Sequence, residues 1–307
     1  MDIFFFTMKI FILIVLLLFT ADNSFAVVPG MDEHKALTDI YDVIPVFLIG
    51  GFIGTIGTLI GAGGGFIVVP ILLIFYDFSP QHAIGTSMAV VYLNSLSGTF
   101  SYMLQKRIDY EIGIKFSVAA VPGVFFGAML SRSFDMNSFS LIFGLLLCFM
   151  SYSIFSGKRL SVIRVNALDE PLSRSLRDAS GRVYTYSPDM PVGLSVSVFV
   201  GVISGLFGIG GGIIHVPLMC SVLGVPVHIA TATSHFILAI TGLLGVITFM
   251  GLKYIDLDYA VFLGVGSIIG AYLGAKISLR TQAVIIKKII ALCLMLMAAR
   301  LIGGVFI

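Results

Sequence analysis

Two glycine-rich segments carry the residues of this 307-residue chain whose types and spacing are best suited to bind a ligand. The first, GTIGTLIGAGGGFIVVP, covers 54–70, and the second, GVISGLFGIGGGIIHVP, covers 201–217. Backbone N–H groups at a helix start attract anions, and glycine lets an anion approach the backbone closely. The pattern favours binding of a small oxyanion at two helix starts, near Gly65 and Gly212. The candidate glycines are Gly61, Gly63, Gly64, Gly65, Gly208, Gly210, Gly211 and Gly212.

Close helix packing is the alternative explanation of the same glycines. Gly57, Gly61 and Gly65 recur every four residues, which is the spacing of small-residue contacts between membrane helices. Each glycine also disfavours a helix by about 1 kcal/mol relative to alanine, so five in twelve residues predict an interruption. A membrane tolerates such a break only where its backbone is buried in protein or lines a wet cavity.

Polar side chains follow both segments inside apolar surroundings. Two Thr-Ser pairs could donate hydroxyl hydrogen bonds to an oxyanion, or could instead cap or back-bond their own helices. Asn94 lies deep in an apolar stretch and could contact a solute or another helix; its counterpart in the second half is Thr241. The residues of the pairs are Thr86, Ser87, Thr233 and Ser234.

His215 and His235 lie inside apolar stretches, and the matching positions in the first half are Val68 and Met88. An ionisable group within a membrane span is a functional candidate by default, and histidine titrates near neutral pH. Either histidine could couple a proton to anion movement. A neutral, hydrogen-bonded histidine in the protein interior is the alternative.

No enzyme motif is present in the sequence. The chain lacks HExxH, GxSxG and a phosphate-binding loop with its lysine. Cys148, Cys220 and Cys293 stand in apolar runs without metal-ligand spacing. We therefore expect no catalytic residues, no cofactor and no metal. The absence of a basic tract argues against a nucleic-acid partner.

The composition predicts an all-α polytopic membrane protein. The chain is 58% hydrophobic and 11% charged, against about 25% charged in an ordinary soluble domain. The two glycine-containing stretches are too long for one span and too short for two, which fits two half-length helices meeting at the glycines. The apolar stretches are 44–75, 82–104, 112–131, 138–156, 191–222, 228–250, 259–279 and 284–306.

Five segments are expected along the chain. The first resembles a secretory signal peptide, with Lys9 before an apolar core and a small-x-small site ending at Ala26, although an uncleaved anchor is the alternative. The segments are a signal peptide over 1–26, an external segment over 27–43, transmembrane repeat A over 44–156, a cytoplasmic polar loop over 157–190 and transmembrane repeat B over 191–307.

Lysine and arginine placement tests the topology, because cytoplasmic loops carry their excess. If each glycine stretch enters and returns to its own side, the loops at 105–115 and 157–190 become cytoplasmic, together with 276–288. That arrangement puts most basic residues inside. Single crossings would put most of them outside, unless the N-terminus is cytoplasmic.

The match between the halves extends beyond the glycines. At an offset of 147 residues, Lys106 and Asp109 match Lys253 and Asp256, and further glycines match as well. Each repeat then contains a broken, Gly-interrupted helix hairpin plus three transmembrane helices. This odd number of crossings makes the two repeats inverted, an architecture of secondary transporters.

The doubled GxxxGxGGGxxxxP phrase, the Thr-Ser pairs and the central polar loop resemble the TauE/SafE sulfite exporter family. The resemblance covers about 44–307. It implies a secondary transporter of the plasma membrane that moves a small sulfur-containing anion, such as sulfite or a sulfonate. The implied partners are that solute and the lipid bilayer, and a homo-oligomer stays open. The alternatives are a passive anion channel or a membrane-embedded enzyme or sensor.

Overall fold

The structure is a computed structural model that describes residues 37, 40–156, 174–278 and 284–306. Within these residues the chain forms ten helices and one two-stranded hairpin. The expected signal peptide over 1–26 lies outside the described residues, as do most of the external segment and 157–173 of the polar loop. The predicted all-α class is confirmed for the described membrane-embedded part.

The same series of five helices occurs twice. α4 and α9 begin and end 147 residues apart, and so do the starts of α3 and α8. The first series is α2 (Ile40–Ile60), α3 (Gly65–Phe75), α4 (Pro80–Leu104), α5 (Tyr110–Ser131) and α6 (Met136–Ser156). The second is α7 (Met190–Phe207), α8 (Gly212–Ser221), α9 (Val227–Gly251), α10 (Leu257–Ile277) and α11 (Val284–Phe306).

The glycines divide each long stretch unequally. α2 and α7 have 21 and 18 residues, whereas α3 and α8 have 11 and 10. The expectation of two half-length helices therefore holds only for the second member of each pair. α2 begins at Ile40, before the predicted apolar stretch over 44–75, and the break comes after a full span length.

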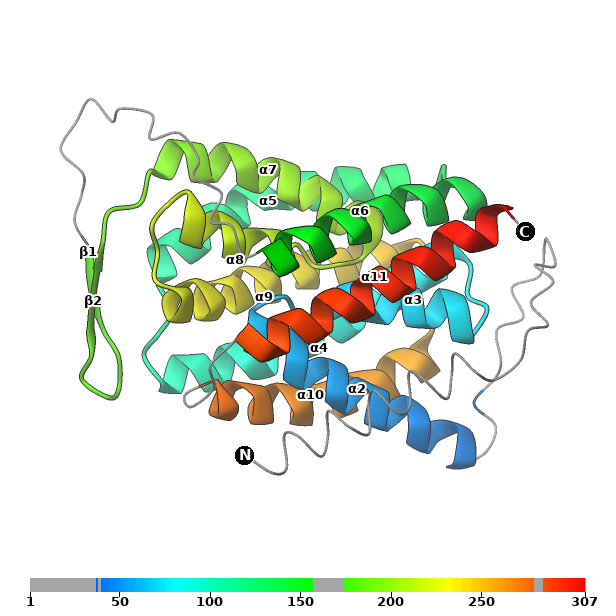
Figure 1. Cartoon of the computed structure of the whole chain (residues 1–307), viewed down its shortest axis with the longest axis horizontal. Coiled ribbons are helices and arrows are strands. Elements are labelled where there is room, and N and C mark those ends of the chain that lie inside the picture. Colours follow the sequence, from blue (N-terminus) through cyan, green and yellow to red (C-terminus); the bar gives the residue numbers. More distant parts are fainter. Residues whose placement is uncertain (1–36, 38–39, 157–173, 279–283, 307) are drawn as a thin grey trace.

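Six helices in the described residues are long and apolar enough to cross a membrane: α2, α5, α6, α7, α9 and α10. α4 was also expected to span and has 25 residues, but polar side chains lower its hydropathy. Ser87, Asn94 and Ser95 of α4 are fully buried. α4 keeps these groups away from lipid because it packs between α9, α10 and α3 (Figure 1).

Helix pairs from opposite halves form the body of the molecule. α10 packs along α2, α5 packs along α7, α4 along α9, and α6 along α11 (Figure 1). Glycines allow the backbones to touch, because a Cβ atom at these positions would meet main-chain atoms of the facing helix. The glycines are Gly50, Gly54, Gly266 and Gly270 between α2 and α10, and Gly123, Gly127, Gly201 and Gly205 between α5 and α7.

The two short helices lie toward opposite ends of the molecule. In Figure 1, α8 lies toward the end that carries the hairpin, and α3 lies toward the other end. At the hairpin end, Gln105 Nε2 donates to the carbonyl of Ala275, and the backbone carbonyl of Gln105 accepts from the N–H of Ala179. At the other end, Gln81 Nε2 donates to the carbonyl of Phe134 at 2.8 Å.

Part of the polar loop is ordered against the helices. β1 (Arg174–Arg177) pairs antiparallel with β2 (Val183–Tyr186), with Arg174 opposite Tyr186. Both residues reach Asp109 at the start of α5: Arg174 Nη1 lies 3.2 Å from Asp109 Oδ1, and the Tyr186 hydroxyl donates to Oδ2 at 2.7 Å. The sequence predicts only a cytoplasmic polar loop over 157–190, and the hairpin was not expected.

Candidate functional site

The first break is a turn that only glycine adopts without strain. α2 ends at Ile60, and Gly61, Gly63 and Gly64 have φ angles of 82°, 73° and 86°. These values lie in the left-handed region, where a Cβ atom collides with the backbone. α3 then begins at Gly65.

The second break repeats this geometry. Gly208, Gly210 and Gly211 have φ angles of 68°, 73° and 78°, and α8 begins at Gly212. The helix starts predicted near Gly65 and Gly212 are therefore present. The chain direction reverses through backbone turns at both sites, so the interruption follows from the glycines and needs no proline.

The two breaks touch each other. A Cβ atom at Gly65 would meet the carbonyl oxygen of Gly208, and one at Gly212 would meet the carbonyl oxygen of Gly61. The start of each short helix thus lies against the end of the other break's preceding helix. This close approach is the packing role considered from the sequence, and it gathers both glycine clusters in one place.

Two serines join the breaks by reciprocal hydrogen bonds. Ser87 Oγ donates to the carbonyl of Gly208 at 2.9 Å. Ser234 Oγ donates to the carbonyl of Gly61 at 2.7 Å. Both serines are fully buried, and the partners in the second bond are each related to those in the first by the 147-residue offset. The hydroxyl groups proposed to face a solute thus contact the glycine carbonyls.

The two threonines lie one residue away and make a different contact. Thr233 Oγ1 accepts from the backbone N–H of Asp109, and Thr86 Oγ1 accepts from that of Asp256, both at 3.0 Å. Each aspartate caps the helix that follows it, α5 or α10. Thr86 and Thr233 therefore hold helix starts at opposite ends, away from the meeting point of the breaks.

Asn94 joins the first break to a buried polar network. Its Nδ2 donates to the carbonyl of Gly63 at 3.0 Å, and its Oδ1 accepts from Thr58 Oγ1 at 3.3 Å. His235 Nε2 lies 3.2 Å from Thr58 Oγ1, and Tyr102 donates its hydroxyl to the carbonyl of Thr58 at 2.9 Å. His235 comes from α9 of the second half but serves the break of the first half.

His215 lies beside the second break. Its Nε2 is 3.3 Å from Ser197 Oγ, and Ser197 donates its own proton to the carbonyl of Gly193 at 2.8 Å. Nε2 must therefore be the donor. His215 Nδ1 and Ser204 Oγ have no hydrogen-bond partner within the described residues. A Cβ atom at Gly211 would lie 3.6 Å from this Nδ1 atom, which places the ring next to the start of α8.

Sequence reasoning missed the two serines near His215 and several further residues at this site. Thr58 and Tyr102 complete the network of Asn94, and Val91 and Leu238 pack on the glycines of both breaks. Val91 and Leu238 are related by the same offset of 147 residues. The internal repeat marks these two positions as equivalent, but only the packing of α4 against α9 shows that both lie near both breaks.

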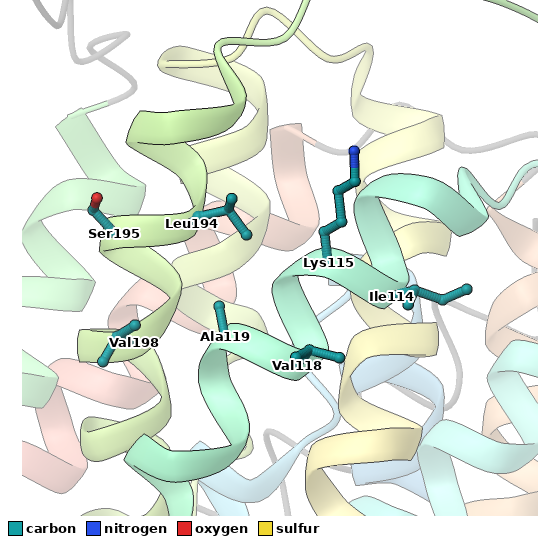
Figure 2. A pocket seen from close by; sticks show the side chains of 7 residues that line it. All are labelled: Ile114, Lys115, Val118, Ala119, Leu194, Ser195 and Val198. Carbon is teal, nitrogen blue, oxygen red and sulfur yellow. The ribbon is translucent and has the colours of Figure 1, made fainter.

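An outward-facing groove lies elsewhere, between α5 and α7 (Figure 2). Its volume is about 550 Å³ and its lining is mostly apolar. Lys115 at its rim is paired with Glu111 at 2.7 Å. None of the break residues lines it. The lining residues are Ile114, Lys115, Val118, Ala119, Leu194, Ser195 and Val198.

Among the described residues, no cluster of three or more His, Cys, Asp or Glu side chains could hold a metal ion. The gathered groups at the breaks are glycine backbones, hydroxyls, one amide and two imidazoles. Such a set can bind an anion by hydrogen bonds and can exchange a proton, and it contains no charged side chain that would trap an anion.

Comparison with known proteins identifies the family. The chain matches the sequence model described as "Sulfite exporter TauE/SafE" over residues 46–301. It is 36% identical over 267 residues to "Probable membrane transporter protein YunE" of Bacillus subtilis, covering 84% of this chain and 97% of that protein. It is also 29% identical over 252 residues to "Probable membrane transporter protein MJ0441" of Methanocaldococcus jannaschii, covering 77% and 86%.

No solved structure matches the chain significantly. The six apolar helices, the doubled glycine break and the family match over most of the sequence agree with one another. The chain is a multi-pass plasma-membrane protein and belongs to the TauE/SafE sulfite exporter family of membrane transporters.

Proposed function

We propose that this protein is a secondary transporter of a small sulfur-containing anion, such as sulfite or a sulfonate, and not an enzyme. The observation that carries the proposal is the meeting of the two glycine breaks, joined by the bonds of Ser87 and Ser234. Paired interrupted helices in corresponding halves are the arrangement that transporters use to bind a solute near the middle of the membrane.

The proposal includes inverted repeats. α3 and α8 lie toward opposite ends of the molecule, which supports inverted repeats (Figure 1). In such repeats the chain of each broken helix pair returns to the side of the membrane from which it entered. The turn at 105–109 and Ala275 share the hairpin end, which agrees with the prediction that the basic loops are cytoplasmic. Alternating access would move the α2–α10 pair against the α5–α7 pair around the breaks, because glycine contacts join the two halves within each pair.

The proposed anion site is the contact between the breaks. The starts of α3 and α8 would supply N–H groups, through Gly64 and Gly65 in the first half and Gly211 and Gly212 in the second. The N–H of Gly63 already donates to the carbonyl of Gly57 at 3.3 Å. Ser87 and Ser234 now donate to glycine carbonyls. When the breaks separate, those hydroxyls become available to an oxyanion. Exchanging one acceptor for another keeps each buried hydroxyl satisfied throughout.

His235 is the proposed proton carrier, because its network is one proton short when the ring is neutral. Nδ1 lies 3.3 Å from the Thr231 carbonyl and Nε2 lies 3.2 Å from Thr58 Oγ1, while Thr58 donates to Asn94. A neutral ring has one N–H and cannot donate in both directions. A protonated ring satisfies all three contacts. His215 makes one contact, through Nε2 to Ser197, which needs only the single N–H of a neutral ring, and it is proposed to stay neutral.

The test is anion flux in proteoliposomes made with purified protein. Sulfite, thiosulfate, sulfate, sulfoacetate and taurine are each offered with and without an imposed pH gradient. We expect saturable movement of one sulfur anion that responds to the gradient. Movement without saturation or response would indicate a passive channel. Folded protein that moves none of the five would refute the sulfur-anion proposal, and chemical conversion of a labelled compound would reveal an enzyme.

A further inference from the structure

We propose that Val91 and Leu238 form an apolar septum that closes the path between the two breaks and limits the size of the transported anion. This inference rests on the proposed function for its size limit. The barrier itself can be tested without it. "Septum" denotes these two side chains below. Both are fully buried, one on α4 and one on α9.

Each septum side chain lies against both breaks. A methyl group built at Gly210 would lie 2.6 Å from Val91 Cγ1 and 2.8 Å from Leu238 Cδ2. A methyl group at Gly63 would lie 3.1 Å from Val91 Cγ1 and from Leu238 Cδ1. The two side chains therefore occupy the space that the glycines leave open.

The helix starts are covered in the same way. A methyl group at Gly65 would lie 2.7 Å from Val91 Cγ2, and one at Gly212 would lie 2.7 Å from Leu238 Cδ1. Hydrocarbon thus lies beside the first residue of both short helices in this conformation. An anion can reach both helix starts together only if the septum moves or if the side chains are made smaller.

An apolar constriction stops ions because water and hydrated ions leave it. The septum is such a constriction at the point where the polar backbone groups of the breaks converge. Its neighbours offer a contrast, since Ser87 and Ser234 are polar and already bonded to glycine carbonyls. Closure by aliphatic groups needs no ion pair and opens with the small displacement that separates the breaks.

The first experiment compares the double variant Val91→Ala/Leu238→Ala with Val90→Ala/Ile237→Ala. Val90 and Ile237 are also buried, are related by the same offset and are neighbours of the septum in sequence. They are not among the nearest atoms to the break glycines. Proteoliposomes receive methanesulfonate, ethanesulfonate and butanesulfonate beside sulfite. We expect the septum variant to raise butanesulfonate flux relative to sulfite flux about tenfold, a change of about 1.4 kcal/mol in barrier. The control should leave the ratio unchanged.

The second experiment needs no transport substrate. Val91→Ser/Leu238→Ser should open a passive iodide leak, followed with an iodide-sensitive dye inside the liposomes. Val90→Ser/Ile237→Ser is the matched control, and thermal unfolding in detergent verifies that each variant is folded. Suppose that the native protein moves sulfite, but the alanine variant does not change the ratio of butanesulfonate to sulfite flux and the serine variant opens no iodide leak. That result would overturn the septum proposal and leave the transport proposal standing. An iodide leak in a protein that never moves a sulfur anion would support the septum and refute the substrate. A leak equal in both serine variants would also overturn the septum.

Discussion

The two glycine breaks have the same backbone and differ in the side chains around it. Their three left-handed glycines have φ angles between 68° and 86°, and each short helix begins at the next glycine. Each break also gives one carbonyl to a serine of the opposite half. The shared features are thus those that the reversal of the chain and the contact between breaks require.

The first break has a polar network that the second lacks. Thr58, Asn94 and Tyr102 correspond to Gly205, Thr241 and Phe249 at the offset of 147 residues, and His235 corresponds to Met88. Thr241 donates to the carbonyl of Ile237 in its own helix instead of to a break. Phe249 and Met88 cannot donate a hydrogen bond.

The second break has a smaller polar group with no counterpart at the first. His215, Ser197 and Ser204 correspond to Val68, Gly50 and Gly57. Both histidines therefore come from the second half, and each lies beside a different break. The comparison shows that the glycine backbone forms both breaks, while the different side chains around them allow each break a different role.

The largest expected effect tests the shared backbone. Gly65→Ala and Gly212→Ala each place a Cβ atom against a carbonyl of the opposite break. Overpacking of a tightly packed interior costs about 1–3 kcal/mol, so both variants should unfold at lower temperature and lose transport. Thermal unfolding in detergent and sulfite flux measure the two effects. The losses should be similar because the contacts are equivalent.

Gly251→Ala is the matched control, because a Cβ atom there would have no neighbour within 4 Å. It should leave stability and flux nearly unchanged. If Gly65→Ala strongly lowers stability and flux while Gly212→Ala is tolerated, the two breaks are not equivalent in packing. The proposed likeness of their backbones would then be wrong.

The next effect tests the difference between the histidines. His235→Met introduces the residue found at the matching position, where Met88 packs against Gly245 as His235 packs against Gly98. The variant should therefore stay folded. If His235 carries the proton, flux should continue while its response to a pH gradient falls about tenfold, equivalent to about 1.4 kcal/mol of coupling.

His215→Val, which likewise copies the first half, is the comparison variant. The contact of its Nε2 with Ser197 needs only the one N–H of a neutral ring, so the response to the gradient should persist. If the response to the pH gradient is lost in His215→Val and kept in His235→Met, His215 and not His235 carries the proton.

The sequence predicted the breaks well because glycine has a direct backbone consequence. The starts of α3 and α8 fall at Gly65 and Gly212, and the offset of 147 residues relates the main contacts. The helical class followed from composition. The unequal division of each broken pair did not follow, because hydropathy marks the apolar stretch but not where a full span ends within it.

The partners of the polar side chains could not be predicted. Ser87 and Thr86 are adjacent in sequence, yet one contacts a break and the other accepts from Asp256 N–H at the end of the molecule. His235 serves the break of the opposite half. These contacts depend on how α4 and α9 pack side by side, which a single sequence does not encode in any local pattern.

A smaller effect concerns the reciprocal serines. Ser87→Ala and Ser234→Ala each leave a buried glycine carbonyl without its donor, which costs about 1 kcal/mol in stability. Ser95→Ala is the control, since the Ser95 hydroxyl donates to the Tyr92 carbonyl of its own helix. Thermal unfolding should give equal losses for the first two variants and less for the third. Unequal losses would mean that one break relies on its serine more than the other.

The smallest effect concerns the two ends of the molecule rather than the breaks. Asp178 in the hairpin turn lies 3.8 Å from Arg107, and the hydrogen bond from the Ser180 hydroxyl lowers the pKa of this carboxyl group. Because the lowered pKa favours the charged form in the folded hairpin turn, the turn that presents Asp178 to Arg107 should be complete at neutral pH and weaken as the pH falls through that lowered pKa.

Hydrogen exchange over 174–186, normalised to a free peptide of the same sequence, measures this release between pH 7 and pH 3, the range that ends below the usual aspartate pKa of about 3.9. Asp178→Asn should exchange faster already at neutral pH and lose most of the pH dependence. At the opposite end, the residue matching Arg107 is Tyr254, which packs edge-on against His82. The turn at 252–256 therefore has an aromatic residue in place of Arg107 and should not follow the same acid profile. Unchanged pH dependence in Asp178→Asn would show that the ion pair with Arg107 does not hold the hairpin, and would leave the contacts of Arg174 and Tyr186 with Asp109 as its anchor.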